Sequence, residues 1–138
     1  MIIMGNSNIL SKTKRRRLYL NKVVANKIDK EPEDTTVNIN QDTVCVILEN
    51  TKEMLSIKVN TKIFIEPEVL FSIEIEHIME FILREKITDE EIEKNIDEIV
   101  APLGAEISYI IASLTKEMLG SHIILPPGIK VNNIEKIK

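Results

Sequence analysis

The stretch that decides the fold is VLFSIEIEHIMEFIL, from Val69 to Leu83, in which two glutamates and one histidine interrupt an apolar run. Apolar residues alternate through most of this run, which is the period-two pattern of a β-strand with one covered face and one solvated face. In a strand, Glu74 and Glu76 point to one side and His77 points to the other. This geometry is wrong for the three side chains to bind one metal ion.

His77 shares its side of the predicted strand with apolar residues, among them Phe71, Ile73 and Ile75, so we expect a partly buried core histidine. Ile78 and Ile82 break the pattern, because they fall on the same side as the glutamates. Two explanations stay open. Either a β-bulge shifts the register there, or both faces of the sheet are covered at that end, for example by another subunit.

The same cluster also has to be weighed as an acid/base pair. Two carboxylates about 5 to 9.5 Å apart can hydrolyse glycosides, and Glu74 and Glu76 could meet that spacing. Alternating glutamates on a solvated strand give the same spacing far more often. The four glycines stand singly, and the sequence has neither a phosphate-binding loop nor a nucleophile elbow. We therefore expect no enzyme, no catalytic residue and no cofactor.

Metal binding is also not expected. Structural zinc sites usually need four ligands, and the second histidine, His122, lies far away in the sequence. The single cysteine, Cys45, excludes an intramolecular disulfide and lies in a strand-like run, so we expect a buried, inert thiol.

Upstream of the opening stretch, the sequence predicts three more strands, at residues 17–28, 35–49 and 55–65. The third is the clearest, because it alternates over about eleven residues. Interruptions near residues 40–42 predict a bulge or a bend in the second strand. Short polar breaks between the runs are of hairpin length, which favours antiparallel pairing.

Downstream, the apolar period becomes helical. Thr88 and Glu91 form a capping-box pair, which predicts a short helix that Pro102 interrupts. A longer helix then runs to about Leu119, and Gly120 is the expected C-terminal cap. Its apolar stripe is wide enough to contact both the sheet and another subunit. The stripe residues are Leu103, Ile107, Ile110, Ile111, Leu114 and Met118.

Strands followed by helices predict an α+β domain, a four-stranded antiparallel sheet with a long C-terminal helix packed on one face. At 138 residues, one domain is expected. We assign residues 1–13 to a flexible N-terminus, residues 14–131 to the domain, and residues 132–138 to a short charged C-terminal tail.

The charge pattern limits the class of partner. A net charge of −4 argues against nucleic acid, and the basic run KTKRRR, Lys12 to Arg17, is better explained as charge that protects a strand edge. No apolar run approaches the roughly 18 residues that a membrane span needs. The start, MIIMGNSNIL, is too short for the apolar region of a signal peptide. We expect a cytoplasmic protein without membrane insertion.

The order of these features resembles the SecB family of export chaperones. The residues that carry the resemblance are FSIEIE (Phe71 to Glu76), NIDEIVAPLGAEISYIIASLTKEMLG (Asn95 to Gly120) and ILPP (Ile124 to Pro127), with a weaker likeness in LYLNKVVANKI (Leu18 to Ile28). The order of elements matches over residues 18–131.

The resemblance implies an ATP-independent holdase that binds unfolded or preprotein clients in apolar grooves and delivers them to the Sec export motor SecA. It also implies a homotetramer, a dimer of dimers with the longer helices between the dimers. Glu74 and Glu76 would form the acidic sheet face on which the motor docks. The residues that would line the client groove are Ile123, Ile124, Leu125, Pro126 and Pro127.

This chain departs from the family at three places. Many members have Phe-Pro shortly after the glycine, where this chain has His122 and Ile123; Val131 replaces the usual aromatic after the second proline; and little chain remains for the family's C-terminal helix. The alternative interpretation is therefore a SecB-like adaptor or structural oligomer that binds one dedicated partner, for example an antitoxin-type client.

Overall fold

The computed structural model describes residues 7–27, 38–66, 71–120, 122–125 and 128–136. Its elements are α1 (Ser7–Lys12), β1 (Thr13–Lys27), β2 (Asn38–Asn50), β3 (Met54–Glu66), β4 (Phe71–Leu83), α2 (Asp89–Val100), α3 (Leu103–Leu119) and β5 (Asn133–Lys136).

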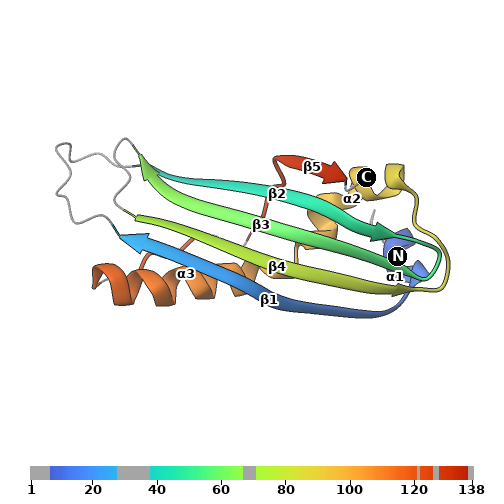
Figure 1. Ribbon diagram of the computed structural model, residues 1–138, viewed down its shortest axis with the longest axis horizontal. Coiled ribbons are helices and arrows are strands. Elements are labelled where there is room, and N and C mark those ends of the chain that lie inside the picture. The colour runs from blue at the N-terminus through green and yellow to red at the C-terminus, as the bar shows by residue number, and fades with distance from the viewer. Residues whose placement is uncertain (1–6, 28–37, 67–70, 121, 126–127, 137–138) are drawn as a thin grey trace, which may run out of the picture.

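The sheet has the strand order β1-β4-β3-β2-β5. The first four strands pair antiparallel, whereas β5 pairs parallel to β2. Helices α2 and α3 lie against one face of the sheet, and the other face is turned toward the viewer in Figure 1. The α+β class is thus confirmed. Among the described residues, the expected four-stranded antiparallel sheet is corrected to a five-stranded mixed sheet, because part of the predicted tail returns to the sheet as β5. The shorter helix α2 covers the same face as the long helix α3.

The core lies between the sheet and the helices. We call the helix-covered side of the sheet the inner face and the opposite side the outer face. Side chains of the inner face alternate strictly with those of the outer face, as the pleat of a strand requires. Buried core residues include Phe71, Ile73, Ile75 and Met79 of β4, Leu55, Ile57 and Val59 of β3, Cys45 and Ile47 of β2, and Ile92, Ile96, Leu103 and Ile111 of the helices.

The alternation of β4 continues to its end, so the predicted bulge near Ile78 and Ile82 is not in this strand. The irregular positions between β1 and β4 fall in β1 instead, between Thr13 and Arg15 and between Leu20 and Lys22. Ile78 remains on the outer face but is only 8% exposed. Its direct neighbours in register are Tyr19 of β1 and Lys58 of β3. In β2 the register shift lies between Ile47 and Glu49, not near residues 40–42.

The first turn of α2 joins both ends of the described chain to the domain. The predicted capping box is present, with Thr88 and Glu91 each bonding the other's backbone N–H. Glu91 also accepts from Lys12 Nζ at 2.9 Å, and Asp89 accepts from Lys136 Nζ at 2.9 Å. These cations lower the pKa of both carboxyl groups. We expected residues 1–13 to be loose, but residues 7–12 form α1, and Ile9 is buried in the core.

Pro102 separates α2 from α3, and α3 ends where the sequence predicts. Gly120 adopts φ +81°, a left-handed conformation that glycine takes without steric cost, and its N–H donates to the Lys116 carbonyl oxygen.

After α3, hydrogen bonds to polar side chains of α2 and α3 hold the following segment against these helices. The Ile123 N–H donates to Thr115 Oγ1 at 2.8 Å, and Ser108 Oγ donates to the Leu125 carbonyl oxygen at 2.7 Å. Farther on, the backbone N–H of Val131 donates to Asp97 of α2 at 3.0 Å. Asn132 and Thr43 then form two hydrogen bonds of 2.8 Å with each other, which place β5 beside the edge of β2.

Candidate functional site

His77 faces the helices, as predicted, and is fully buried. Its Nε2 lies 3.3 Å from Glu106 Oε1 of α3, close enough for an ion pair if the ring is protonated. The contact is not a hydrogen bond, and both ring nitrogens lack a hydrogen-bond partner among the described residues. The histidine is therefore a polar group enclosed in the core, separated by the strand from Glu74 and Glu76 on the outer face.

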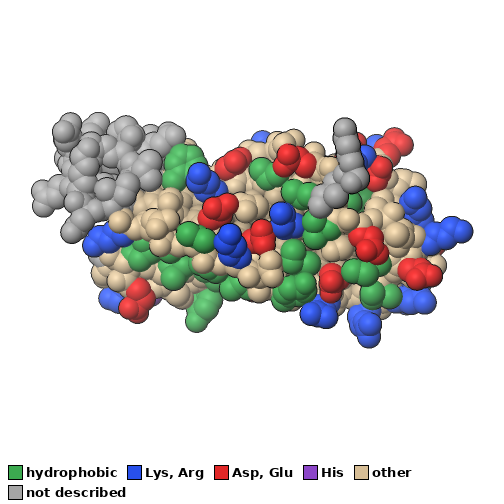
Figure 2. All heavy atoms as spheres, in the orientation of Figure 1, with side chains coloured by type: hydrophobic (Ala, Val, Ile, Leu, Met, Phe, Trp, Pro, Cys, Tyr) green, Lys and Arg blue, Asp and Glu red, His purple; other side chains and the backbone are tan. Residues whose placement is uncertain are grey.

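Glu74 and Glu76 lie side by side on the outer face, among basic and amide side chains. Asn60 Nδ2 donates to Glu74 at 3.1 Å, and Asn21 Nδ2 donates to Glu76 at 2.6 Å. Lys58 Nζ lies 3.9 Å from Glu76. Figure 2 shows the consequence: red and blue side chains are interspersed across this face, with green apolar ones between them. A motor-docking role for the two glutamates stays a prediction, and the surface around them is mixed in charge.

The predicted stripe of α3 divides into two sets. Leu103, Ile107 and Ile111 are buried against the sheet. Ile110, Leu114 and Met118 pack against the same core but are only partly buried. The expectation that one side of the stripe contacts the sheet thus matches the first set, and the second set leaves apolar surface within reach of another chain.

In the segment predicted to line a client groove, side chains that pack against the core alternate with an exposed one. Ile123 and Leu125 pack against the core, whereas Ile124 is 77% exposed. Pro126 and Pro127 lie outside the described residues. The hydrogen bond from Ser108 to Leu125 places Ile124 beside the turn of α3 that carries Tyr109, which is 73% exposed.

Sequence reasoning missed Tyr109 and Leu20 as accessible apolar groups. Leu20 is exposed on the inner face of β1, opposite His77. Tyr109 could have been found, because at about 100° per residue it lies roughly 200° around α3 from Ile107, on the side of the helix that points away from the sheet. We define the helix-layer surface as the exposed apolar groups on this side of the molecule outside the α3 stripe, among them Leu20, Tyr109 and Ile124.

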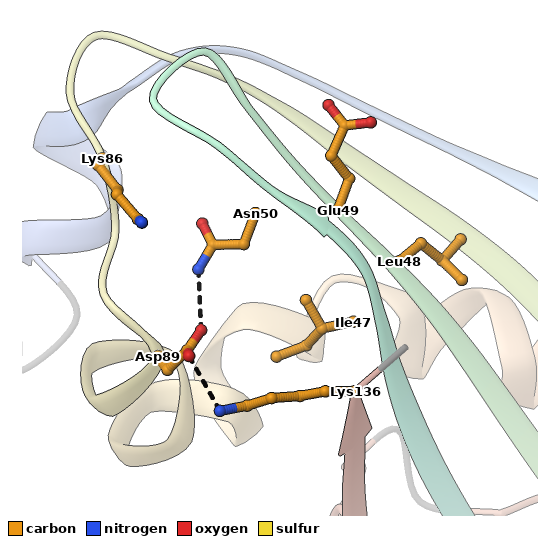
Figure 3. A pocket seen from close by; sticks show the side chains of 7 residues that line it. All are labelled: Ile47, Leu48, Glu49, Asn50, Lys86, Asp89 and Lys136. Atoms are coloured by element: carbon orange, nitrogen blue, oxygen red, sulfur yellow. Dashed lines mark hydrogen bonds and ion pairs between the residues drawn. The ribbon is translucent and has the colours of Figure 1, made fainter. Parts of the chain in front are cut away.

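A hollow of about 250 Å³ lies where β2, β5 and the start of α2 meet (Figure 3). In it Asp89 is held between Asn50 and Lys136, and Lys86 extends toward the same opening. The Asp89 carboxylate is already bonded to Asn50 and Lys136, so it links α2 to β2 and β5.

The described residues contain no group of three or more histidine, cysteine, aspartate or glutamate side chains that could hold a metal ion. Burial raises the pKa of the Cys45 thiol to about 12, with a smaller contribution from Asp97, which keeps the thiol protonated and unreactive. No single described helix is long and apolar enough to cross a membrane, while α2 and α3 taken together, bent by 46°, meet the length and composition required.

No family model matches the sequence, and no curated protein matches it. Among solved structures, the fold is similar to that of a SecB-like chaperone from Mycobacterium tuberculosis, solved in complex with a ChAD peptide from the HigA1 antitoxin. The two chains are 11% identical with a TM-score of 0.72, over 88% of this chain and 94% of that chain.

A second similar structure is a protein of unknown function from Streptococcus agalactiae. It is 16% identical with a TM-score of 0.53, over 81% of this chain and 95% of that chain. The chain therefore has a SecB-like fold, which confirms the structural part of the resemblance.

Proposed function

We propose that this protein is an ATP-independent holdase chaperone that binds extended apolar polypeptide segments along its helix layer. The observation that carries the proposal is the helix-layer surface, in which Tyr109 and Ile124 each expose about three quarters of their surface. Clustered apolar exposure marks binding surfaces. A holdase needs such surface, because affinity for many sequences comes from buried area more than from specific polar contacts.

The proposal is tested by aggregation of a chemically unfolded, unrelated protein, followed by light scattering as the denaturant is diluted. We expect suppression at a near-stoichiometric ratio without added nucleotide. Unhindered aggregation at a several-fold excess of this protein would refute the holdase function.

A double variant, Tyr109→Ser with Ile124→Ser, locates the surface. Both side chains are exposed, so the fold should survive, and suppression should fall because the client loses apolar contact area. The matched control is Val24→Ser, which removes an exposed aliphatic side chain from the outer face of β1, opposite Glu74. Equal losses in the double variant and in the control would show that the helix-layer surface is not the client site.

The second candidate is an adaptor that binds one dedicated partner. It is favoured by the similarity in fold to a chaperone that was solved with an antitoxin peptide. An adaptor would retain a single native partner in a pull-down and would leave unfolded proteins to aggregate. The same double variant should then abolish capture of that partner.

The proposal includes an assembly. Ile110, Leu114 and Met118 present apolar area on α3 that a second copy would cover, and we propose a homotetramer of the 15.8 kDa chain that acts in the cytoplasm and has no catalytic activity. Light scattering coupled to size exclusion measures the mass directly. A monomer at micromolar concentration would exclude this assembly.

Delivery to an export motor is a separate part of the proposal and rests on Glu74 and Glu76. Glu74→Lys should weaken binding to a SecA-type motor without changing oligomeric mass, because it reverses the charge of an exposed side chain. Unchanged binding would remove Glu74 from that role.

A further inference from the structure

A second hollow, of about 640 Å³, lies on the outer face of the sheet, near the end where β1 begins and β4 ends. We call it the outer-face hollow; its lining residues are Arg15, Arg17, Met54, Glu80 and Ile82. The strand register explains how they meet, because Ile82 lies opposite both Arg15 and Met54, and Arg17 lies opposite Glu80. Its volume is within the range of about 300 to 1,000 Å³ typical of binding pockets.

The charges at its rim are not balanced. Arg17 is partly engaged, with Nε 3.7 Å from Glu80 Oε1 and its guanidinium carbon 4.8 Å from the centre of the Tyr19 ring. Arg15 is exposed and forms no ion pair with any residue in the described ranges. Every charged residue of β1 is a lysine or an arginine. One carboxylate therefore faces two guanidinium groups, and the rim retains an excess of positive charge.

The floor is apolar. Ile82 and Met54 are half-buried, and Ile78, which lies on the same face of β4, is a nearly buried neighbour. In Figure 2 green side chains lie beside blue ones in the lower right part of this face. Ile78 and Ile82 therefore share the outer face with the glutamates for different reasons. Ile78 is covered within the chain, whereas Ile82 lines an open hollow.

We infer that the outer-face hollow binds an extended polypeptide segment in which a carboxylate side chain lies next to an aliphatic one. The planar guanidinium of Arg15 suits a carboxylate, with which arginine forms paired, charge-assisted hydrogen bonds. An aliphatic neighbour would cover Ile82 and Met54. A nucleic acid fits less well, because Glu80 would repel phosphates and the floor offers them no donors.

This inference does not depend on the proposed function. The helix-layer surface and the outer-face hollow lie on opposite sides of the sheet, so a polypeptide at one leaves the other accessible. The chain would then have two polypeptide sites of different chemistry, one purely apolar and one that requires an acidic group.

The test is a titration of the full chain against a fluorescein-labelled peptide made of Glu-Leu pairs separated by glycine, followed by fluorescence anisotropy. We expect saturable binding that weakens about ten-fold when glutamine replaces the glutamates, since the charge-assisted bonds are then lost. Arg15→Ala should weaken binding of the original peptide by a similar factor.

The matched control is Lys62→Ala, which removes an exposed cation from the same face. Lys62 lies opposite Glu74, eight positions along β4 from Ile82 and hence about 26 Å away at the usual strand rise. This variant should bind within two-fold of the wild type. The Tyr109→Ser, Ile124→Ser double variant should also bind normally, which separates this site from the proposed client surface.

Three results would overturn the inference: no saturable binding of the peptide, equal binding of the glutamine version, or equal losses in Arg15→Ala and Lys62→Ala. A labelled DNA oligonucleotide serves as the competing ligand. Tighter binding of DNA that is lost in Arg15→Ala would assign the hollow to nucleic acid and overturn the inference as well.

Discussion

The two faces of β4 are built from the same thirteen residues and differ in almost every property. On the inner face every side chain from Phe71 to Leu83 is buried, and all are apolar except His77. On the outer face only Ile78 is buried, and glutamates predominate. The glutamates meet cations or amides on the neighbouring strands, as Glu76 meets Lys58 and Asn21.

The difference shows where stability and binding reside in this chain. Burial of aliphatic surface on the inner face supplies most of the favourable free energy of folding, whereas exposed ion pairs contribute little. The outer face can therefore carry functional groups, such as the Arg15 guanidinium, without cost to the fold. Substitutions on the two faces should accordingly differ in both size and sign.

The largest effect is expected for Ile75→Ala. Ile75 is fully buried between Val23 and Thr61 of the adjacent strands. Its truncation should lower the free energy of unfolding by about 2 to 5 kcal/mol, through lost burial and a residual cavity. Urea unfolding followed by circular dichroism measures the change, at fixed protein concentration because self-association would contribute.

Two outer-face variants are the controls for that loss. Glu74→Ala should change stability by no more than about 0.5 kcal/mol, as is usual for exposed positions. Ile78→Ala should cost less than half of the loss at Ile75, since its cover comes from two cross-strand neighbours rather than the core. Equal losses at Ile75 and Ile78 would mean that a second layer covers the outer face.

Much of this contrast could be predicted from the sequence, because it depends on local periodicity. The alternation from Phe71 to Leu83 placed His77 inside and the glutamates outside. Thr88, Glu91 and Gly120 marked helix ends through local capping chemistry that depends on residues within one turn. The stripe of α3 placed Ile107 and Ile111 correctly against the sheet.

The missed features depend on contacts between residues far apart in sequence. β5 has only four residues, two of them charged, and pairs parallel to a strand that ends more than eighty residues earlier. α1 is a single short helix whose one described buried residue, Ile9, packs on a core assembled from later elements. The start of β1 lies in a cationic run that has no alternating pattern. The outer-face hollow is likewise a product of register, which brings Arg15 and Met54 together around Ile82.

The next largest effect is expected for Thr115→Val, which tests what holds the segment after α3, residues 122–125, against the helices. Thr115 is fully buried, and its hydroxyl accepts from the Ile123 N–H while donating to the Ile111 carbonyl oxygen. Valine keeps the shape but leaves that N–H without its partner, at a cost of about 1 to 3 kcal/mol. Ser113→Ala on the same helix is the control. A neutral result for Thr115→Val would show that apolar contacts alone hold the segment.

His77→Leu should have the opposite sign. The buried ring nitrogens have no hydrogen bond of good geometry, so an apolar side chain should raise the free energy of unfolding by about 1 kcal/mol. Calorimetric or urea unfolding at neutral pH measures the gain. Glu106→Gln is the companion variant. If both substitutions destabilise the protein, the 3.3 Å contact between His77 and Glu106 acts as a stabilising ion pair, and the inner face is not purely apolar in its energetics.

The smallest effect is expected between Lys58 and Glu76, whose charged groups are 3.9 Å apart on the outer face. A double-mutant cycle with Lys58→Ala and Glu76→Ala should give a coupling of about 0.5 kcal/mol, because water screens the pair and Asn21 already satisfies one carboxylate oxygen. The coupling should decrease further in high salt. A coupling above about 1.5 kcal/mol that persists in salt would contradict the division of labour between the two faces. The charge pairs around Glu76 would then stabilise the fold. A partner that docked on Glu76 would have to break them, at a cost in the free energy of folding.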